Sequence, residues 1–383
     1  MAEEKQPSKG LLFFYRSDNW VNRFLLRGID TSYIDLPEHS WSMAFTAATL
    51  GINSRVTSST SDIPDISLIS RTSPSVDLGF SAGYRGFGFG YSWDVMNAYT
   101  RRLNFSLGSK SMGLDFAMNT STNINSVITI GDVPFHELGY GDIVITNANL
   151  NLWYALNYAH YSHNAATKQS YIQKHSAGSL LLHLSYMYSN IQLKDTFKID
   201  GAKKPLLPAL MSGMNGMTTR QVAVGLGYGI NYTPNKGKFL LHASAAAMLV
   251  AYSVNHVSYY IADSVLAGLP AGEPMYTLHP AIPVHVTGTV RAALSWEINQ
   301  WVHMSAFATG GHTRFRSRPS EKSHQLTLSQ WDWKVQATIG VRFGAGRDRI
   351  QRAIGENKEV DVWKPKNNRI PEWITGYFWS PKN

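Results

Sequence analysis

The stretch Ser329–Phe343, SQWDWKVQATIGVRF, decides the fold of this chain. From Trp331 onward every second residue is apolar, and the residues between them are polar or small. A period of two places the two sets of side chains on opposite faces of a β-strand. A strand that has lipid on one face and a polar lumen on the other needs this pattern. The stretch therefore predicts a strand of a transmembrane β-barrel.

The same alternation recurs along the chain and predicts an all-β fold, an antiparallel up-and-down barrel of about 12 strands. Most of these strands are roughly 10 to 16 residues long, which suits a tilted membrane span better than a strand of a soluble protein. The predicted strands are 41–56, 75–85, 86–96, 101–109, 112–123, 143–158, 177–190, 219–233, 238–254, 282–297, 300–313 and 328–343.

The connections between these strands alternate in length. Tight turns are predicted at Arg85-Gly86, 109–111, 234–237 and 298–300, and long polar or Pro/Gly-rich loops at 57–74, 124–142, 191–218, 255–281 and 314–327. Long loops at one end and short turns at the other are typical of outer-membrane barrels. An even number of strands places both chain ends on the short-turn side, which is the periplasmic side. Two connections break the rule, because 97–100 is short and 159–176 is long.

Three parts follow from this pattern: an N-terminal periplasmic flank at 1–40, the barrel at 41–343 and a C-terminal periplasmic tail at 344–383. In the first flank, Asp18–Arg27 is compatible with a helix that has Trp20, Val21, Phe24 and Leu25 on one face. The tail is basic and rich in aromatic residues, so we expect it to pack against another element.

The composition narrows the class of protein further. Of the 383 residues, 44% are apolar and only 16% are charged, and the net charge is +9. The absence of cysteine excludes disulfides and thiolate metal sites. The most apolar run, Phe239–Tyr252, is too short for a membrane-spanning helix, which needs roughly 20 residues. The N-terminus, Met1–Lys5, is polar and acidic rather than a signal peptide, so we expect that any export signal has been removed.

Three stretches carry a family resemblance. They are Asp30–Ile34, the hairpin Gly83–Phe89, and the long connection that runs from Tyr161-Ser162-His163 to Gln173–Ser179. Together they resemble an outer-membrane barrel family of the Bacteroidetes, catalogued as domain of unknown function 4421, over residues 28–345. The resemblance implies a location in a Gram-negative outer membrane and a barrel architecture. It implies no catalytic residue.

Charged residues at inward positions are balanced in sign. Internal ion pairs favour a barrel that is closed by its own contacts, whereas an ion-selective pore usually has one sign at its constriction. The small residues Ala223, Gly225, Gly227 and Gly229 leave room in the lumen for another element, and the two aromatic flanks are candidates for it. The predicted polar network of the lumen comprises Asp77, Arg85, Asp94, Arg102, Asp115, Arg291, Glu297, Asp332, Lys334 and Arg342.

Basic residues gather in two of the long loops, which the topology predicts to be extracellular. Phosphate groups of lipopolysaccharide would meet them there, although ordinary solvation of a loop explains the same charges. The residues expected to contact lipopolysaccharide are Lys194, Lys198, Lys203, Lys204, Arg314, Arg316, Arg318 and Lys322.

Two other functions deserve comparison with the barrel. Arg85–Tyr91, RGFGFGY, is similar to the aromatic strand of an RNA-binding domain, but Gly90 stands where that motif has valine, and no amphipathic helices flank it. A barrel hairpin with Phe87 and Phe89 facing lipid explains the same residues. A soluble all-β RNA-binding protein is therefore a weaker alternative, and we expect no nucleic-acid partner.

An outer-membrane enzyme that acts on lipid is the other alternative. His242, His285 and His303 fall on neighbouring predicted strands, with Ser244 and Ser305 close by, but no local motif marks a nucleophile. The sequence therefore predicts a non-enzymatic barrel without cofactor or metal, acting as a narrow or plugged conduit or as a membrane-embedded partner in an envelope complex. Its expected partners are outer-membrane lipid, lipopolysaccharide and other envelope proteins.

Overall fold

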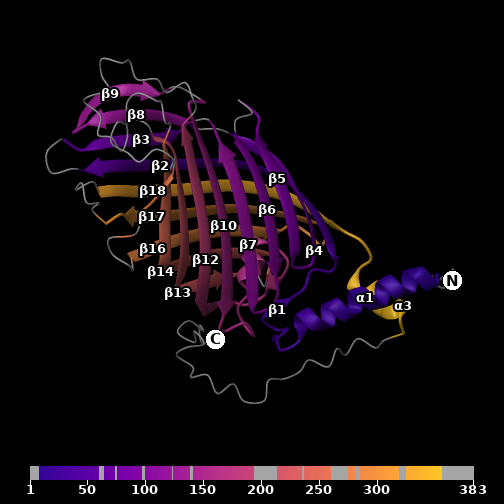
Figure 1. Ribbon diagram of the computed structural model, residues 1–383. Coiled ribbons are helices and arrows are strands. Elements are labelled where there is room, and N and C mark those ends of the chain that lie inside the picture. The colour runs from indigo at the N-terminus through magenta and orange to yellow at the C-terminus, as the bar shows by residue number, and fades with distance from the viewer. Residues whose placement is uncertain are drawn as a thin grey trace.

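Twelve strands form a closed antiparallel ring in the computed structural model of the chain (Figure 1). Each strand pairs with the next in sequence, and the last pairs with the first, so the predicted up-and-down barrel is confirmed. The structure describes residues 8–59, 64–73, 76–96, 100–122, 124–138, 141–193, 214–234, 237–259, 275–278, 280, 285–318 and 325–355.

The barrel strands lie close to the predicted ranges. The first two tight turns, after β4 and after β6, are also where the sequence placed them. The strands are β2 (Trp41–Ser59), β4 (Asp77–Tyr84), β5 (Phe87–Asp94), β6 (Thr100–Gly108), β7 (Met112–Ser121), β10 (Ile143–Ala155), β12 (Ala177–Leu193), β13 (Met214–Tyr232), β14 (Phe239–Tyr259), β16 (His285–Glu297), β17 (Val302–Arg316) and β18 (Gln325–Phe343). We call the end with the tight turns the turn end and the opposite end the loop end.

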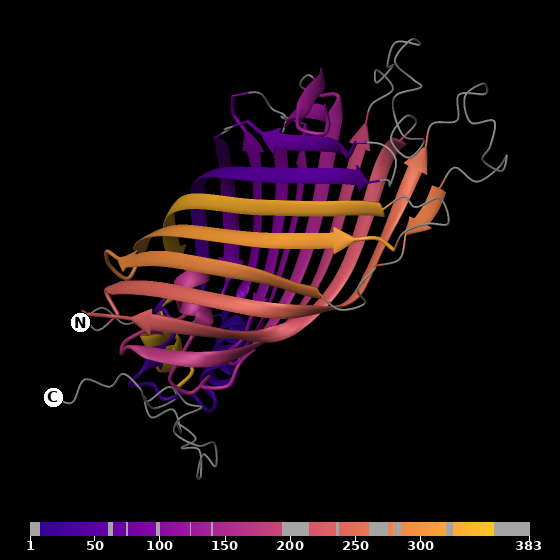
Figure 2. The same cartoon turned by 90° about the vertical axis from the view of Figure 1, so that its left-hand side faces the viewer.

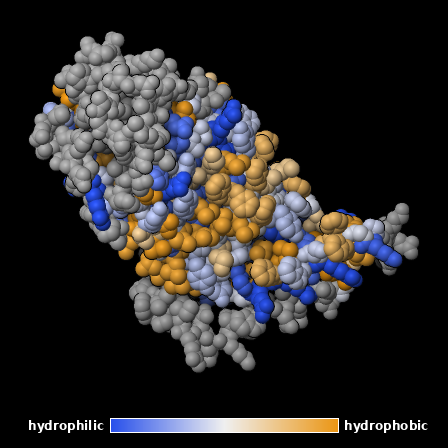
Figure 3. Space-filling view, in the orientation of Figure 1, coloured by the Kyte–Doolittle hydropathy of each residue, from blue (hydrophilic) through white to orange (hydrophobic). Residues whose placement is uncertain are grey.

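The two faces of the barrel wall differ in chemistry. On β18, Val335 and Ile339 are 48% and 49% exposed on the outside, while Lys334 and Gln336 face the cavity inside. Phe87, Phe89, Val286 and Val290 also face outward. These orientations agree with the predicted alternation. Figure 3 shows the resulting band of apolar side chains across the middle of the molecule.

The height of this band can be derived from one strand. Trp331 and Trp333 lie at its upper rim on β18, and Phe343 lies at its lower rim beside Trp41. The stretch from Trp333 to Phe343 measures roughly 33 Å at about 3.3 Å per residue. At a strand tilt of about 40° this corresponds to a height of roughly 25 Å, the usual height of the apolar band of a transmembrane barrel.

Four shorter strands extend the sheet at the loop end: β3 (Ile66–Thr72), β8 (Ile124–Ile130), β9 (Val133–Leu138) and β15 (Met275–Leu278). β3 pairs with the upper half of β2, β8 with β3, and β9 with β8, while β15 pairs with β14. The prediction of loops at 57–74, 124–142 and 255–281 is therefore wrong in part. The short strands, of four to seven residues, were missed because they fall below the roughly 10 to 16 residues that a membrane span predicts.

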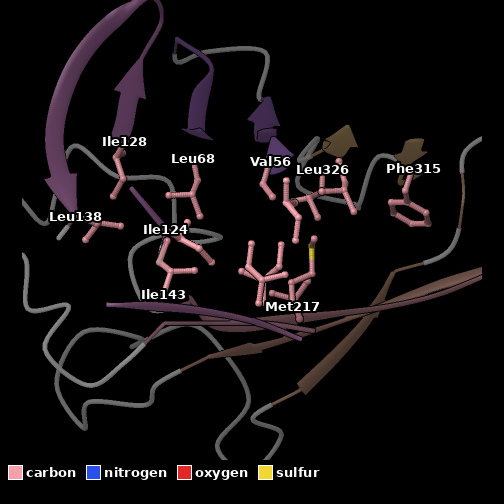
Figure 4. Close-up of a cluster of buried hydrophobic side chains, with 14 of the residues drawn as sticks. Val56, Leu68, Ile124, Ile128, Leu138, Ile143, Met217, Phe315 and Leu326 are labelled. Carbon is pink, nitrogen blue, oxygen red and sulfur yellow. The ribbon is translucent and has the colours of Figure 1, made fainter. Parts of the chain in front are cut away.

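Apolar side chains fill the loop end of the barrel. Val56 and Leu326, on the first and last strands, meet Ile143 and Met217 from the opposite wall (Figure 4). We call this group the loop-end core. Inside the barrel, side chains are apolar at this level and largely polar in the lumen below it. Its buried members are Leu50, Ile52, Val56, Ile66, Leu68, Ile124, Ile128, Leu138, Ile143, Ile145, Ile191, Met217, Val257, Phe315, Leu326 and Leu328.

Three helices and a two-stranded sheet lie at the turn end. They are α1 (Lys9–Leu26), α2 (His163–Thr167), α3 (Arg347–Ala353), β1 (Ile34–Asp35) and β11 (Ile172–Gln173). Helix α1 begins well before the predicted Asp18, because Ser8 caps it by accepting a hydrogen bond from the backbone N–H of Leu11 at 3.4 Å. Within the described part of the chain, no helix is long and apolar enough to cross a membrane.

Candidate functional site

The connection between β10 and β12, residues 156–176, folds back into the barrel at the turn end, where α2 lies inside the ring of strands (Figure 2). We call it the plug. Tyr161 and His163 are almost completely buried, and so are the alanines of α2. Ser162 caps α2 by accepting from the backbone N–H of Ala165 at 3.2 Å, so the turn into the helix is fixed locally. The sequence marked this connection by its unusual length and by its part in the family resemblance, but not as an element inside the barrel.

Strand β13 holds the plug through one buried side chain. The Asn231 amide nitrogen donates to the carbonyl of Ser162 at 2.8 Å and to Oε1 of Gln173 at 3.1 Å. Gln173 Oε1 also accepts from the Ser162 backbone N–H at 2.9 Å. Two points of the plug are thereby tied to the barrel wall by the same amide group.

The amide oxygen of Asn231 contacts a histidine on β14, and this histidine contacts a serine on the same strand. Asn231 Oδ1 lies 2.8 Å from Nδ1 of His242, and His242 Nε2 lies 3.2 Å from Oγ of Ser244. Because the amide oxygen can only accept, the proton of a neutral His242 ring is on Nδ1, and Nε2 accepts from the serine hydroxyl. The sequence singled out His242 and Ser244, but it did not reveal Asn231.

One ion pair and one hydrogen bond join the plug to β7 and β18, and further ion pairs within the wall support them. Lys168 Nζ lies 2.8 Å from Asp115 Oδ1 on β7, and Arg291 on β16 approaches the other oxygen of Asp115 at 3.7 Å. On β18, Arg342 Nη2 donates to the Gln169 carbonyl at 3.1 Å and to Glu297 Oε1 at 2.7 Å. Four of the predicted lumen residues thus contact the plug or stabilise a residue that does.

The remaining charged lumen residues form separate groups. Arg102 and Asp77 make a buried ion pair of 3.1 Å, and Asp94 accepts from the backbone N–H of Met96 at 2.8 Å. Asp332 and Lys334 line a cavity of about 420 Å³ between the plug and the loop end.

Arg85 lies at the turn end, next to α1, and not in the middle of the lumen. Its Nη1 donates to the Pro37 carbonyl at 2.7 Å, and its Nη2 is 3.7 Å from Asp18 Oδ2. The partner of Arg85 is on a helix outside the barrel, so no pattern within the strands could have identified it.

A second polar group joins the N-terminal flank, the plug and the segment after the last strand. Asp35 accepts from Lys174 at 2.7 Å and from Arg347 at 2.8 Å, and Glu38 Oε1 accepts from the backbone N–H of Asp348 at 3.1 Å. We call these contacts the clasp. Burial acts to raise the pKa of Asp35, but the hydrogen bonds and charges of Arg347 and Lys174 outweigh it and hold the pKa below its ordinary value.

Only part of the predicted lipopolysaccharide contact surface falls in the described chain. Arg314, Arg316 and Arg318 are exposed at the loop end, where Arg316 donates to Gln325 at 2.8 Å and Arg318 to the Pro280 carbonyl at 3.1 Å. The other five basic residues lie outside the described residues: Lys194, Lys198, Lys203, Lys204 and Lys322. Most of the C-terminal tail, with its aromatic side chains, also lies outside them.

The residues that sequence reasoning missed are those of the plug. Tyr161, His163, Lys168 and Gln169 belong to a segment without alternation, and their partners lie on distant strands. Among the described residues, no group of three or more His, Asp or Glu side chains is placed to hold a metal ion.

These features define a class of protein: a twelve-stranded up-and-down β-barrel with an apolar exterior, a polar lumen and an internal plug. The chain belongs to the family of the domain of unknown function DUF4421, which matches it over residues 28–343. A comparison with curated proteins gave no match.

Three solved structures with a similar arrangement are distant in sequence. The outer membrane protease OmpT from Escherichia coli is 8% identical, with 81% of this chain and 98% of that chain covered and a TM-score of 0.40. The translocator domain of the autotransporter NalP from Neisseria meningitidis is 11% identical, with 86% and 97% covered and a TM-score of 0.28. The outer membrane protein OprG from Pseudomonas aeruginosa is 9% identical, with 81% and 100% covered and a TM-score of 0.26.

Proposed function

We propose that the protein is a non-enzymatic β-barrel of a Gram-negative outer membrane whose lumen is closed, and that it serves as a membrane-embedded partner in an envelope complex. The observation that carries this proposal is that the lumen is closed at both of its ends. The plug, with Tyr161 and His163 buried, occupies the turn end, and the loop-end core fills the opposite end. A steady flow of solute requires an open path, so these contacts favour a plugged barrel over a porin.

The location in a membrane is supported by the exterior of the barrel. Large apolar side chains such as Phe45, Val286 and Val290 are 73%, 61% and 59% exposed. Contact with water would make such a surface prone to aggregation, whereas lipid satisfies it. The closed ring also leaves no strand edge inside the band, as the hydrocarbon core demands.

We propose that the turn end is periplasmic and the loop end extracellular. The tight turns and both ends of the described chain lie together at the turn end (Figure 1). Short turns on the periplasmic side and longer segments outside are the usual arrangement in such barrels. In this orientation, Arg314, Arg316 and Arg318 would meet the phosphates of lipopolysaccharide.

Conductance in planar bilayers tests the closed lumen. The intact protein should insert, as judged by a heat-dependent shift in gel migration, and give no large steady current. Large, ohmic, long-lived channels from the intact chain would contradict the proposal and restore the porin interpretation. Purification in a mild detergent, followed by identification of proteins that remain bound, tests the role as a partner.

Hydrolysis is a second candidate, and one observation favours it: the hydrogen-bond order Ser244, His242, Asn231 is that of a Ser-His-Asn catalytic group. A structural role explains the same contacts, because Asn231 also binds the plug. Phospholipid and short-chain ester hydrolysis by the purified protein, compared with Ser244→Ala and Ser305→Ala, separates the two. Activity that disappears only in Ser244→Ala would establish the enzyme.

A further inference from the structure

Helix α1 leaves large aromatic side chains exposed, although it buries Leu25 and Leu26 near its C-terminal end. The face that packs against the protein includes Asp18, Asn19 and Asn22, all buried. The face that points away carries Phe13, Trp20 and Phe24, which are 67%, 68% and 53% exposed. Trp20 and Phe24 stack on each other, with ring centroids 6.0 Å apart. We call this side of α1 the aromatic face.

Basic residues lie along the same face. At 100° per residue, Lys9, Arg16 and Arg23 fall on a stripe beside Phe13 and Trp20. The single acid of the helix, Asp18, lies on the opposite side and accepts a 2.7 Å hydrogen bond from the Tyr84 hydroxyl. The outward side of α1 is therefore both aromatic and positively charged. A helix that lies on an anionic lipid surface can use such a side, because its long basic side chains reach up to the headgroups while the rings beside them enter the lipid.

The position of α1 matches the edge of the apolar band. Tyr84 at the end of β4 and Arg85 in the turn after it hold Asp18, and Phe87 faces outward at the start of β5. The Tyr84 ring also contacts Trp41 at the lower rim of the band, at 4.8 Å between centroids. Figure 3 shows α1 beside the lower edge of the band, carrying both hydrophobic and hydrophilic residues.

The first half of α1 extends away from the barrel. All buried residues of the helix lie from Asp18 onward, while Phe13 and Phe14 are 67% and 69% exposed (Figure 1). Two neighbouring phenylalanines on a helix surrounded by water would be unfavourable. On the surface of a bilayer, the same helix would place the rings of its aromatic face below the headgroups and its basic side chains among them.

We propose that α1 is an interfacial helix that lies flat on the membrane at the turn end, with its aromatic face in a phospholipid surface that carries anionic headgroups. This inference rests on the membrane location proposed above. It assigns to the N-terminal flank a function that the barrel alone does not need: fixing the rotation and depth of the turn end relative to the bilayer.

The absence of cysteine makes a direct test practical, because one introduced thiol can carry a nitroxide label in the full-length protein. Three single variants are compared in vesicles that contain phosphatidylglycerol: Trp20→Cys on α1, Val335→Cys on the band, and Gln300→Cys in an exposed turn. Labels in lipid are relaxed more by oxygen than by a water-soluble nickel chelate, and labels in water show the reverse. We expect the Trp20 and Val335 positions to report lipid and the Gln300 position to report water.

The outcomes separate the two proposals. A label at position 335 in lipid together with a label at position 20 in water overturns the interfacial helix and leaves the membrane barrel intact. A label at position 335 in water overturns the barrel proposal itself. A label at position 20 that is immobile and reached by neither reagent shows that a protein, or a second copy of this chain, covers the aromatic face, and this too overturns the inference.

A charge-reversal experiment tests the headgroup contact. Lys9→Glu with Arg16→Glu, in the Trp20→Cys background, should weaken attachment in anionic vesicles by about five-fold for each positive charge lost. In vesicles of phosphatidylcholine alone, the same variants should have little effect. Arg71→Glu with Arg314→Glu, an equal change of charge at the loop end, is the matched control and should leave the label in lipid. Equal behaviour of all variants in both kinds of vesicle contradicts the anionic surface.

Discussion

The hydroxyl oxygen of Tyr161 lies where a side chain on Gly229 would be: a β-carbon added at Gly229 would stand 2.1 Å from it. Tyr161 belongs to the plug and Gly229 to the barrel wall, so the missing side chain makes room for the plug. The sequence predicted that the glycines of this strand would leave space for another element. The element that occupies the space over Gly229 is the connection between β10 and β12, and not one of the aromatic flanks that the sequence suggested.

Replacing Gly229 with alanine should therefore loosen the plug. The wall is rigid and Tyr161 is fully buried, so overpacking should destabilise the barrel by about 1–3 kcal/mol. Gly288→Ala is the control, because a β-carbon there has its nearest neighbour at 3.4 Å. Urea denaturation in vesicles measures the difference, and current fluctuations in planar bilayers report displacement of the plug. Equal stability of the two variants would mean that Tyr161 moves aside freely.

The stability of the barrel should depend strongly on keeping both members of the buried ion pair between Arg102 and Asp77. Their side chains are 5% and 0% exposed. Arg102→Met leaves a carboxylate without its cation and should lower the free energy of unfolding by about 3–5 kcal/mol. The double variant Arg102→Met with Asp77→Asn should be closer to the wild type, because it removes the unpaired charge as well. If the double variant is less stable than Arg102→Met, another group compensates Asp77.

Neighbouring residues on β18 should respond oppositely to the same substitution. Val335→Arg places a charge on the outer face and should cost about 2–4 kcal/mol near the middle of a membrane. Gln336→Arg places it in the polar cavity and should cost much less. The fraction that refolds into vesicles, read from the heat-dependent shift in gel migration, compares the two. Equal refolding would show that the register of β18 relative to the membrane is different.

The clasp should make the turn end sensitive to acid. Because the pKa of Asp35 is lowered in the folded protein, its contribution is fully present above the ordinary aspartate pKa of about 4 and is lost as the pH falls through the lower folded value. Arg347→Met and Asp35→Asn should both reduce this acid dependence. Limited proteolysis of the turn end between pH 6 and pH 3 measures it. An unchanged profile in Asp35→Asn would assign the acid sensitivity to other groups, such as Asp30, whose pKa is also lowered.

The barrel strands could be read from the sequence because each has a local signature. Residues such as Val335 and Gln336 alternate at a fixed period, and the pattern survives over ten or more residues. β3 and β8 are only seven residues long, and they pack into the loop-end core rather than span the band. Their segments therefore resembled polar loops.

The site could be predicted only in part, because the residues that contact each other in it are far apart in the sequence. Inward positions such as Asp115 and Arg342 followed from alternation, but Lys168 and Gln169, which bind them, lie in a segment without a period. No pattern in the sequence marked Asn231 as a residue of the site. Its role follows from its position between His242 and Ser162, which only the folded arrangement reveals.

The pairing of β2 with β18 closes the barrel, and we call it the seam. It sets the order in which the molecule can be assembled. Trp41 pairs with Phe343, and Figure 2 shows the two strands side by side although they come from opposite ends of the chain. Until β18 has been synthesised, β2 keeps one edge without hydrogen-bond partners, which is a template for mispairing. The loop-end core also draws on both strands, through Val56 and Leu326. A chain that ends before β18 would therefore have neither a seam nor a complete core, and it would remain an open sheet in need of protection.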